Sequence, residues 1–528
     1  MKIARIFRAI LRLILTLFGL ILNPLTGFIF HLVYDKNARK VPPIQNEILL
    51  QSATRLAQRI RQREVKAVTV MEAFIDRVKT VNPIVNAVVA NRFDEAIKEA
   101  RAVDSLLDGG DLSEEYSENK APWLGVPLSV KEAFALSGMP NSSGLLVRQG
   151  TLATSDASVV VSLKKAGVIP FIVTNTSELC MWYESANHLY GRTKNPYDTA
   201  RIVGGSSGGE GCIIAAGGAV IGIGSDIGGS IRMPAFFCGI FGHRTSKGVV
   251  PNDGQFPSPT ANDMDLLSTG PMCRYAEDLK PMLQIMAGNN ARMLKLDQKV
   301  DLGSLKYYTM EDDGGSLLAS NVDPQLKEAQ IKAVIYIEQN FNLTVKKVKL
   351  HRFKYSLEMW SALMYSSGGT SFCEYMGNME GVVNPFPELL KWLVGRSKHT
   401  LPAIGLGIGE KFDALLASTN EKFLKCLEEL KTELKELLGE DGILLYPSHP
   451  LLAPYHNEPM LHPFNFSYTG LFNALGLPVT QCPLGLSSEG LPMGMQIICS
   501  MFNDHLSLAL ARELEHGLGG WTNPGHIA

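Results

Sequence analysis

The sequence lacks the patterns that usually mark metal sites, disulfide frameworks and nucleotide-binding loops. Its eight cysteines form no C-x-x-C pair and show no zinc-ligand spacing. Neither a G-x-x-x-x-G-K-[ST] phosphate loop nor a G-x-G-x-x-G turn after a strand is present. We therefore expect a protein that needs no metal and no organic cofactor.

The sequence also has no excess of either charge and no internal repeat. Its 50 lysines and arginines against 52 aspartates and glutamates give a net charge of −2 at pH 7. Nucleic-acid binding requires a basic surface, so we expect no nucleic acid among the partners. With 528 residues, of which 45% are hydrophobic, the chain has the composition of a large globular protein.

What the sequence does have is a long hydrophobic run at its N-terminus, within MKIARIFRAILRLILTLFGLILNPLTGFIFHLVYDKNARK. No charged residue occurs from Leu13 to Tyr34. As a helix, this run would span roughly 33 Å, which is enough to cross a bilayer. We therefore predict that residues 1–40 form a membrane anchor. The basic residues before the run suit an anionic lipid surface: Lys2, Arg5, Arg8 and Arg12.

Two shapes of this anchor remain open. Pro24, near the middle of the run, breaks or kinks a helix, so the run is either a kinked single-pass helix or a monotopic hairpin in one leaflet. A cleaved signal peptide is the weaker interpretation, because no A-x-A-like site follows. The membrane is expected to be that of the endoplasmic reticulum or of lipid droplets.

After the anchor, helical patterns alternate with short apolar runs. Residues 123–134 read WLGVPLSVKEAF and residues 168–174 read VIPFIVT, with the helical pattern DASVVVSLKKAG between them. The same kind of apolar run returns in GILLYPSHP and LPMGMQIIC. This alternation is typical of an α/β fold with a layered core.

Two glycine clusters that contain serine stand close together, GGSSGG at 204–209 and SDIGGSIRMP at 225–234. Glycine within an ordered element costs about 0.5–1 kcal/mol relative to alanine, so close approaches to the backbone are expected at both. Gly204-x-Ser206-x-Gly208 matches a nucleophile elbow, which would require Ser-His-Asp chemistry. Histidines that could complete it follow: His243, His449 and His456.

The segments VKE at 130–132, GGSSGGEG at 204–211 and SDIGGSIRMPA at 225–235 resemble those of the amidase signature hydrolases. The segments ILLYPSHP and FNFSYTGLFNALGLPVTQCPLGLSSEGLPMGMQII resemble the C-terminal motifs of that family. The resemblance covers roughly residues 45 to 525. It implies the amidase signature fold, a mixed twisted β-sheet covered by helices, and a catalytic domain over residues 41–528.

The resemblance assigns a Ser-Ser-Lys triad, with Ser230 as nucleophile, Ser206 as the bridging serine and Lys131 as the base. A serine hydroxyl is a poor nucleophile until a base takes its proton, and lysine is a base only when it is neutral. Burial would lower the pKa of Lys131 and favour that neutral form. The family pattern also implies a cis peptide bond between Gly205 and Ser206.

The rest of the predicted site surrounds these three residues. Ser207 is expected to support Lys131 or its turn, while Asp226 and Arg232 brace the second turn through their opposite charges. The resemblance assigns the oxyanion hole, which binds the negative oxygen of the tetrahedral intermediate, to the backbone N–H groups of Ile227, Gly228, Gly229 and Ser230.

The segment ELCMWYES is expected to line an acyl pocket, although an ordinary core position is an equally good interpretation for its apolar residues: Cys180, Met181, Trp182 and Tyr183. A membrane-attached amidase suits a substrate dissolved in lipid. We therefore predict hydrolysis of fatty-acid amides, both primary amides such as oleamide and N-acylethanolamines such as anandamide. Residues 387–408 are either a second membrane contact or a buried helix.

Other functions remain open at this point. The chain could be an amidase of small polar amides, a catalytically silent membrane scaffold, or a Ser-His-Asp hydrolase that uses Ser206 as its nucleophile. The apolar N-terminus argues against the first, and the intact triad residues argue against the second. Membrane lipid and lipid amides are the expected partners, and a homodimer is left open.

Overall fold

The computed structural model describes Thr26 and residues 29–525, apart from 110–113, 260–262, 367–368 and 414–416. Its centre is an eleven-stranded mixed sheet with the strand order β1-β3-β2-β6-β8-β7-β12-β13-β11-β9-β10. A separate two-stranded sheet pairs β4 (Ala186–Asn187) with β5 (Gly191–Arg192). The strands of the large sheet are β1 Val88–Asn91, β2 Pro127–Lys131, β3 Ile169–Thr174, β6 Ile221–Asp226, β7 Phe241–Arg244, β8 Ser268–Cys273, β9 Lys306–Thr309, β10 Lys346–Lys347, β11 Gly442–Pro447, β12 Val479–Leu486 and β13 Pro492–Cys499.

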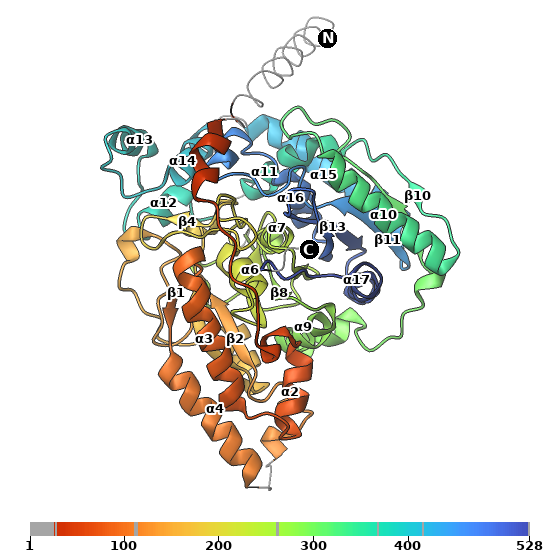
Figure 1. Ribbon diagram of the computed structural model, residues 1–528. Helices are drawn as coiled ribbons and strands as arrows, with labels where there is room; N and C mark the ends of the chain where they lie inside the picture. The colour runs from red at the N-terminus through yellow and green to blue at the C-terminus, as the bar shows by residue number, and fades with distance from the viewer. Residues whose placement is uncertain are drawn as a thin grey trace, which may run out of the picture.

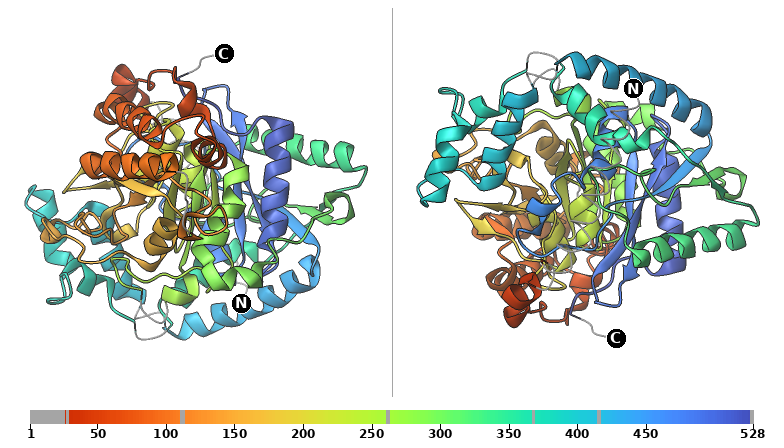
Figure 2. Two further views of the ribbon diagram at one scale, coloured as in Figure 1. Left: turned by 90° about the horizontal axis from the view of Figure 1, so that it is seen from below. Right: turned by 90° about the horizontal axis from the view of Figure 1, so that it is seen from above.

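Helices flank this sheet (Figures 1 and 2). Some begin at a side-chain cap; for example, α2 begins after Ser52, whose Oγ accepts the N–H of Arg55 at 3.1 Å. The helices are α2 Ala53–Arg61, α3 Ala67–Val85, α4 Phe93–Asp108, α5 Ser158–Lys165, α6 Gly208–Ala215, α7 Arg232–Phe237, α8 Asp263–Leu266, α9 Leu279–Ala287, α10 Pro324–Phe341, α11 Ser356–Met364, α12 Phe372–Met376, α13 Pro385–Leu393, α14 Leu401–Asp413, α15 Ala417–Leu438, α16 Ser467–Leu475 and α17 Asp504–Leu518. The predicted mixed sheet covered by helices is thus confirmed.

The part of the sheet that matters most for the site is parallel. Strand β2 pairs in parallel with both β3 and β6, and its last residue, Lys131, lies opposite Thr174 at the end of β3. Every residue of β2, β3 and β6 is buried, as expected for parallel strands with both faces covered. Because parallel strands end at the same edge, Lys131 and the end of β6 at Asp226 are brought side by side.

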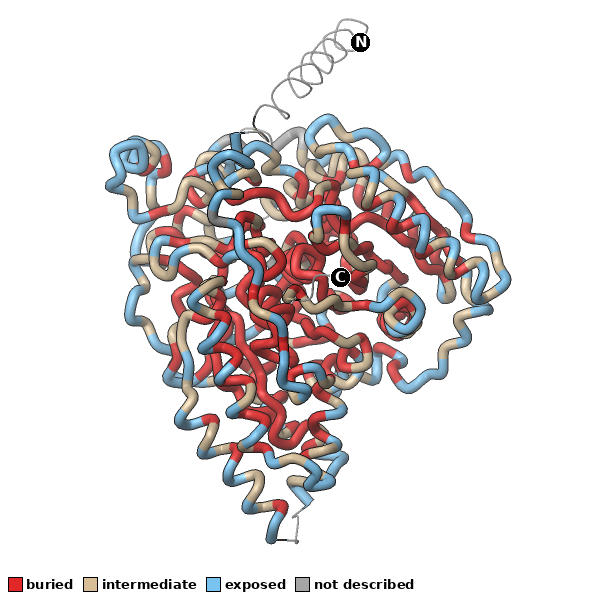
Figure 3. Tube along the Cα trace, in the orientation of Figure 1, coloured by how far each residue is buried: buried red, intermediate tan, exposed pale blue. Residues whose placement is uncertain are grey.

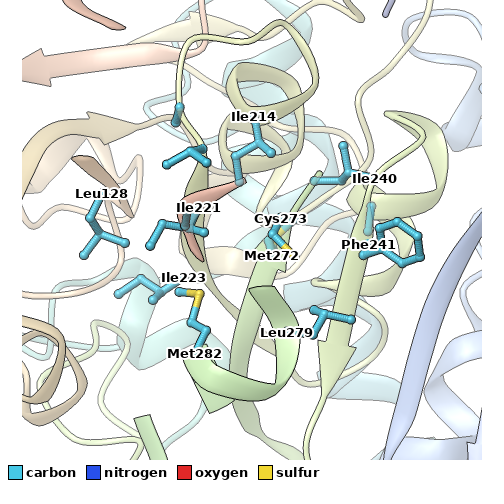
Figure 4. Close-up of a cluster of buried hydrophobic side chains, with 14 of the residues drawn as sticks. Leu128, Ile214, Ile221, Ile223, Ile240, Phe241, Met272, Cys273, Leu279 and Met282 are labelled. Atoms are coloured by element: carbon cyan, nitrogen blue, oxygen red, sulfur yellow. The ribbon is translucent and has the colours of Figure 1, made fainter. Parts of the chain in front are cut away.

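The main hydrophobic core lies on both sides of these strands. Figure 4 shows part of it, where Leu128 of β2, Ile221 and Ile223 of β6, and Met272 of β8 come together. Helices α6 and α7 have no exposed residue and lie at the centre of the molecule (Figures 1 and 3). Both follow the glycine clusters directly, so the two predicted catalytic turns are deeply buried.

A smaller cluster of apolar side chains lies apart from the main core. It joins helices α12 and α14 to loops of the body through Leu145, Leu179, Phe256, Tyr375, Met376 and Ile404. We call residues 371–413, which carry α12, α13 and α14, the cap. The cap therefore has a small core of its own on the surface of the catalytic body.

The predicted membrane anchor falls largely outside the described residues. Residues 29–34 are helical and pack on the body, where the ring of Tyr34 lies 6.3 Å from that of Tyr455 and 5.7 Å from that of His456. Asn457 Nδ2 also donates to the Tyr34 hydroxyl at 2.7 Å. Within the described residues, no helix is both long enough and apolar enough to cross a membrane.

Candidate active site

Three sequence segments bring the predicted catalytic residues together. Lys131 ends β2, Ser206 lies in the turn before α6, and Ser230 lies in the turn between β6 and α7. The Nζ atom of Lys131 lies 2.8 Å from the Oγ atom of Ser206. Ser206 and Ser230 line the same cavity. Lys131 and Ser206 of the predicted triad are therefore in direct contact, and Ser206 shares a cavity with Ser230.

The environment of Lys131 is almost free of water. Its side chain is fully buried, and this burial lowers the pKa of the amine from its ordinary value. Cys180, Asp226 and Glu210 oppose the shift, because negative charge near the amine favours its protonated form. Burial is the larger effect, so the neutral amine forms at a lower pH than it does in free lysine.

A second hydroxyl, which the sequence analysis missed, also contacts Lys131. Ser225 Oγ lies 3.0 Å from Nζ, so the amine is held between two serine side chains. Ser225 could have been singled out because it directly precedes Asp226, near the end of β6, which is parallel to β2. Only the strand pairing makes that place adjacent to Lys131.

The surroundings of the first glycine turn explain why it contains glycine. Gly204 has a φ of +82°, and a Cβ there would lie 2.7 Å from the backbone N of Pro234. At Gly205, a Cβ would lie 2.3 Å from the carbonyl oxygen of Trp182. Any side chain at either position would collide with backbone. The predicted cis peptide bond between Gly205 and Ser206 is confirmed.

The second turn is organised by a buried ion pair. Asp226 Oδ1 lies 2.9 Å from Nη2 of Arg232, and Oδ2 lies 3.0 Å from its Nε. Burial alone would raise the pKa of Asp226, but the nearby Arg232 guanidinium holds it below its usual range. Asn473, which the sequence analysis missed, donates to the Asp226 carboxylate at 2.9 Å and to its carbonyl oxygen at 2.8 Å. The predicted bracing of the turn by Asp226 and Arg232 is confirmed as a contact.

The backbone N–H groups of this turn are not equivalent. That of Gly229 donates to Asp226 Oδ1 at 2.7 Å, so the prediction that it binds the oxyanion is not supported. The physical reason is that Asp226 takes this donor to shape the turn. The N–H groups of Ile227, Gly228 and Ser230 have no hydrogen-bond partner within the described part of the chain. These three remain available to a ligand.

Ser207 links the two turns. Its backbone N–H donates to the carbonyl oxygen of Ser230 at 3.1 Å, and its hydroxyl donates to the carbonyl oxygen of Ser225 at 3.5 Å. The expected support of the turn is therefore present, and it comes through the backbone of the second turn. This contact joins the turn that carries Ser206 to the turn that carries Ser230.

Glu210 is a buried acid behind the site that the sequence analysis did not single out. Its carboxyl accepts hydrogen bonds from Ser129 and, at 2.8 Å, from Thr174 Oγ1. Burial raises its pKa to about 8, while the Lys131 amine and the two hydroxyls lower it. Glu210 lies on α6 directly after the first turn, so it ties that turn to β2 and β3.

Two cavities meet at Ser230. The larger one, of about 390 Å³, has mainly apolar walls and includes all four residues predicted for the acyl pocket, together with Trp360, Leu406, Phe464 and Phe466. The smaller one, of about 230 Å³, carries more polar groups, among them Ser206, Ser225, Gln255, Ser371 and Glu410. Cys180 and Met181 line both cavities. The arrangement fits a substrate with one long apolar arm and a second, more polar arm.

The histidines proposed for a Ser-His-Asp site are engaged elsewhere. His243 contacts Thr480 and Asp504, His456 contacts Glu184 and the Thr199 carbonyl, and Nδ1 of His449 contacts the backbone of Leu451. In the described residues, none of them makes a hydrogen bond with Ser206. Likewise, the residues that the structure describes contain no group of three metal-ligating side chains.

Comparison with known proteins agrees with this geometry. The family described as Amidase matches residues 69–508. The chain is 54% identical to fatty-acid amide hydrolase 2 of Homo sapiens over 93% of both chains, and 53% identical to fatty-acid amide hydrolase 2-A of Danio rerio over 92% of both. Among solved structures, a fatty acid amide hydrolase superposes with a TM-score of 0.71 at 23% identity, over 90% of this chain and 86% of that one.

Proposed function

This chain belongs to the amidase family, and from that premise we propose that it hydrolyses fatty-acid amides to a free fatty acid and an amine. The observation that carries the proposal is the contact of 2.8 Å between Lys131 Nζ and Ser206 Oγ, beside a nucleophile at which an apolar cavity begins. The relatives named fatty-acid amide hydrolase 2, which match over nearly the whole chain, support the substrate class.

In the proposed mechanism, neutral Lys131 takes the proton of Ser206, and Ser206 takes that of Ser230. The freed Ser230 oxygen attacks the amide carbonyl carbon and forms a tetrahedral intermediate. The proton then returns through Ser206 to the leaving nitrogen, which departs as the amine. A water molecule, whose proton is taken through the same relay, then attacks the acyl group on Ser230 and releases the fatty acid.

The negative oxygen of the intermediate is assigned to the backbone N–H groups of Ile227, Gly228 and Ser230. Removal of one such donor typically costs about 2.7–4 kcal/mol in the barrier. Asp226 supports this arrangement, because its hydrogen bonds to Gly229 and to Ile231 fix the backbone between them.

We assign the acyl chain to the larger cavity and the amine portion to the smaller one. The walls of the larger cavity are mostly apolar, which suits an alkyl chain and disfavours a small polar amide. Primary amides such as oleamide and N-acylethanolamines such as anandamide are the proposed substrates.

We further propose that the chain acts at a membrane, attached through the uncharged run before Asp35. Helix α13 supplies a second apolar contact surface at the end of the molecule where residues 29–34 lie (Figure 1). Leu390 and Leu393 on α13 are each 66% exposed, and Phe386 is 49% exposed. Helix α14, which packs on α13, lines the larger cavity, so a lipid amide would reach Ser230 over a short path.

The test uses membranes that contain the full chain and its Ser230→Ala variant. Both are treated with a fluorophosphonate probe, and oleamide hydrolysis is measured. We expect the wild type to be labelled and active, and the variant to be neither. Labelling and turnover that survive in Ser230→Ala would refute the assigned nucleophile, whereas labelling of the wild type without oleamide turnover would refute the substrate.

A further inference from the structure

A short segment between the two cavities is held at both of its ends by buried carboxylates. We call residues 178–184 the strap; it begins at Glu178, ends at Glu184 and carries four of the residues that line the larger cavity. Each glutamate pairs with a histidine from a distant part of the chain, Glu178 with His399 and Glu184 with His456. Both ends thus carry a buried Glu–His pair, but the pairs join the strap to different elements, and Glu184 also forms an ion pair with Arg192 at 2.9 Å.

Glu178 connects the strap to the start of helix α14. Its Oε1 lies 2.8 Å from Nδ1 of His399, and its Oε2 accepts the backbone N–H of Thr400 at 2.7 Å. The side chains of Glu178 and His399 are only 3% and 5% exposed. Thr400 immediately precedes α14, so the carboxylate caps the first turn of that helix and also binds the imidazole beside it.

Helix α14 forms the wall opposite the strap. Pro402, Gly405, Leu406 and Gly409 line the larger cavity, and Leu406 also lines the smaller one. On the other side, strap residues Cys180 and Met181 border both cavities. The two hydrogen bonds of Glu178 therefore run between the two walls that enclose a bound substrate.

The strap has a backbone conformation that depends on its anchoring. Leu179 and Cys180 have φ values of +54° and +60°, in the left-handed region that side chains rarely adopt. The N–H of Leu179 donates to the carbonyl oxygen of Ser143 at 2.8 Å, and the Leu179 side chain packs in the small core of the cap. A shift of α14 would therefore also move the strap residues that line the two cavities.

We propose that Glu178 is a positioning residue that sets the spacing between the strap and α14, and so allows the larger cavity to hold a long acyl chain. The inference rests on the proposed function, because it concerns the same cavity. Within the described residues, the carboxylate of Glu178 bonds to His399 and Thr400 and not to the triad residues, although Cys180 of the strap lies beside the Lys131 amine. Loss of the Glu178 contacts should thus weaken the binding of long chains and leave the chemical step nearly unchanged.

The chain offers a matched control at the other end of the strap. Glu184 Oε1 lies 3.0 Å from Nδ1 of His456, and its Oε2 accepts the N–H of Asn457 at 3.0 Å. Both side chains of this pair are 4% exposed. His456 and Asn457, which bind Glu184, belong to the segment that supports Tyr34. Neither residue lines either of the two cavities at Ser230.

The experiment compares Glu178→Gln with Glu184→Gln in the full-length, membrane-bound protein. Each substitution removes the negative charge of the carboxylate and replaces one accepting oxygen with an amide nitrogen, which weakens the pairing with the neighbouring histidine. For Glu178→Gln we expect KM for oleamide to rise about tenfold, the usual cost of a charge-assisted hydrogen bond, with less than about twofold change in kcat or in KM for hexanamide. For Glu184→Gln we expect oleamide and hexanamide to be affected alike.

A second pair of variants keeps the test valid if Glu178→Gln fails to fold. His399→Ala removes the imidazole but leaves the hydrogen bond between Glu178 and Thr400, and should raise KM for oleamide. His399→Asn places an amide N–H near the position of Nδ1 and should return KM for oleamide toward the wild-type value. Equal effects of Glu178→Gln and Glu184→Gln on oleamide, or an equal rise of KM for hexanamide in Glu178→Gln, would overturn the proposal.

Labelling rates separate this inference from the proposed function. A fluorophosphonate with a dodecyl chain and one with an ethyl group both react at the nucleophile and need no amide turnover. We expect Glu178→Gln to slow labelling by the dodecyl probe about tenfold relative to the ethyl probe. An unchanged ratio would refute the role of Glu178 even in a protein that hydrolyses oleamide, and a changed ratio would support it even in one that does not.

Discussion

The two catalytic turns and the cap are held in different ways. In the turns, around Ser206 and Ser230, backbone N–H groups, carboxylates and a guanidinium bind one another in the main core. Asp226 and Arg232 there are completely buried. The cap rests on a small apolar cluster and on polar contacts such as that of Glu178, and its helix α13 exposes Leu390 and Leu393 at 66%. The proposed function places the chemistry, which needs fixed distances, in the first region and the access of an apolar substrate in the second.

This difference predicts two kinds of variant. Changes in the turns should reduce the chemical step or the stability of the whole protein, because each group there has several partners. Changes in the cap should mainly alter which substrates bind and how they enter, because the residues of the cap do not take part in the proposed chemical step. The following predictions test that division, beginning with the largest expected effect.

Replacement of Lys131 should have the largest effect. Lys131→Ala removes the base, and we expect kcat to fall by about 10³-fold or more. Burial lowers the pKa of this amine, so wild-type kcat/KM should rise with pH as the amine loses its proton, with a midpoint below the ordinary value of 10.5. A pH–rate profile measures this midpoint. A variant that keeps the same rise with pH would contradict the assignment of Lys131 as base.

Removal of the charge of Asp226 should destabilise the protein. Asp226→Asn leaves the buried guanidinium of Arg232 without its partner, and breaking such a pair costs about 3–5 kcal/mol. Denaturant unfolding should show this loss, and activity should fall because the N–H groups of the turn lose their support. Arg352, whose ion pairs with Glu429 and Glu433 are partly exposed, provides the control: Arg352→Gln should lower the free energy of unfolding far less than Asp226→Asn does.

Narrowing the larger cavity should change selectivity without loss of stability. Gly409 on α14 lines this cavity, and no atom lies within 4 Å of the place a Cβ would take. Gly409→Leu should raise KM for oleamide about tenfold and leave hexanamide nearly unaffected, since leucine fills the space needed by the far end of the chain.

The control for this change is Gly381→Leu. Gly381 lies in the cap, also has open space around it, and lines neither cavity. The measurement is KM of each glycine variant for oleamide and for hexanamide. A similar rise for oleamide in the two variants would show that the effect comes from the cap in general.

Exposed leucines on α13 should give the smallest effect. Leu390→Ser with Leu393→Ser should raise KM for oleamide in phosphatidylcholine vesicles about threefold, because the N-terminal run would still hold the protein at the surface. The control change on α10, Ile331→Ser with Ile335→Ser, removes two exposed apolar side chains elsewhere and should have no effect. Equal KM values for the two double variants would contradict a membrane contact at α13.

Much of the catalytic centre could be predicted from the sequence. The motifs around Lys131, Ser206 and Ser230 are local, and glycines that exclude side chains can be recognised from their neighbours. The cis peptide bond before Ser206 and the bracing by Asp226 and Arg232 belong to the same short segments. The triad and the cis peptide bond were predicted through the resemblance of these segments to the amidase signature family, whereas the contact between Asp226 and Arg232 follows from opposite charges that are close in sequence.

Other parts of the site could not be predicted, since they depend on how distant segments meet. The hydroxyl of Ser225 reaches Lys131 only because β2 and β6 are parallel neighbours. Gly229 was predicted to bind the oxyanion, but its N–H is used by Asp226, and only the folded shape of the turn decides between these two acceptors. The wall residues from Cys180 to Tyr183 were equally consistent with ordinary core until the cavities were seen.

The sequence by itself determined the α/β architecture and the need for glycine beside the serines, because these follow from local apolar runs and from steric limits on the backbone. Its motifs gave the candidate triad through their resemblance to the amidase signature family. The tertiary structure alone decided the two cavities, the cap and the pairing of Glu178 with His399, which are 221 residues apart. Such contacts are set by the path of the whole chain, and no short segment of the sequence specifies them.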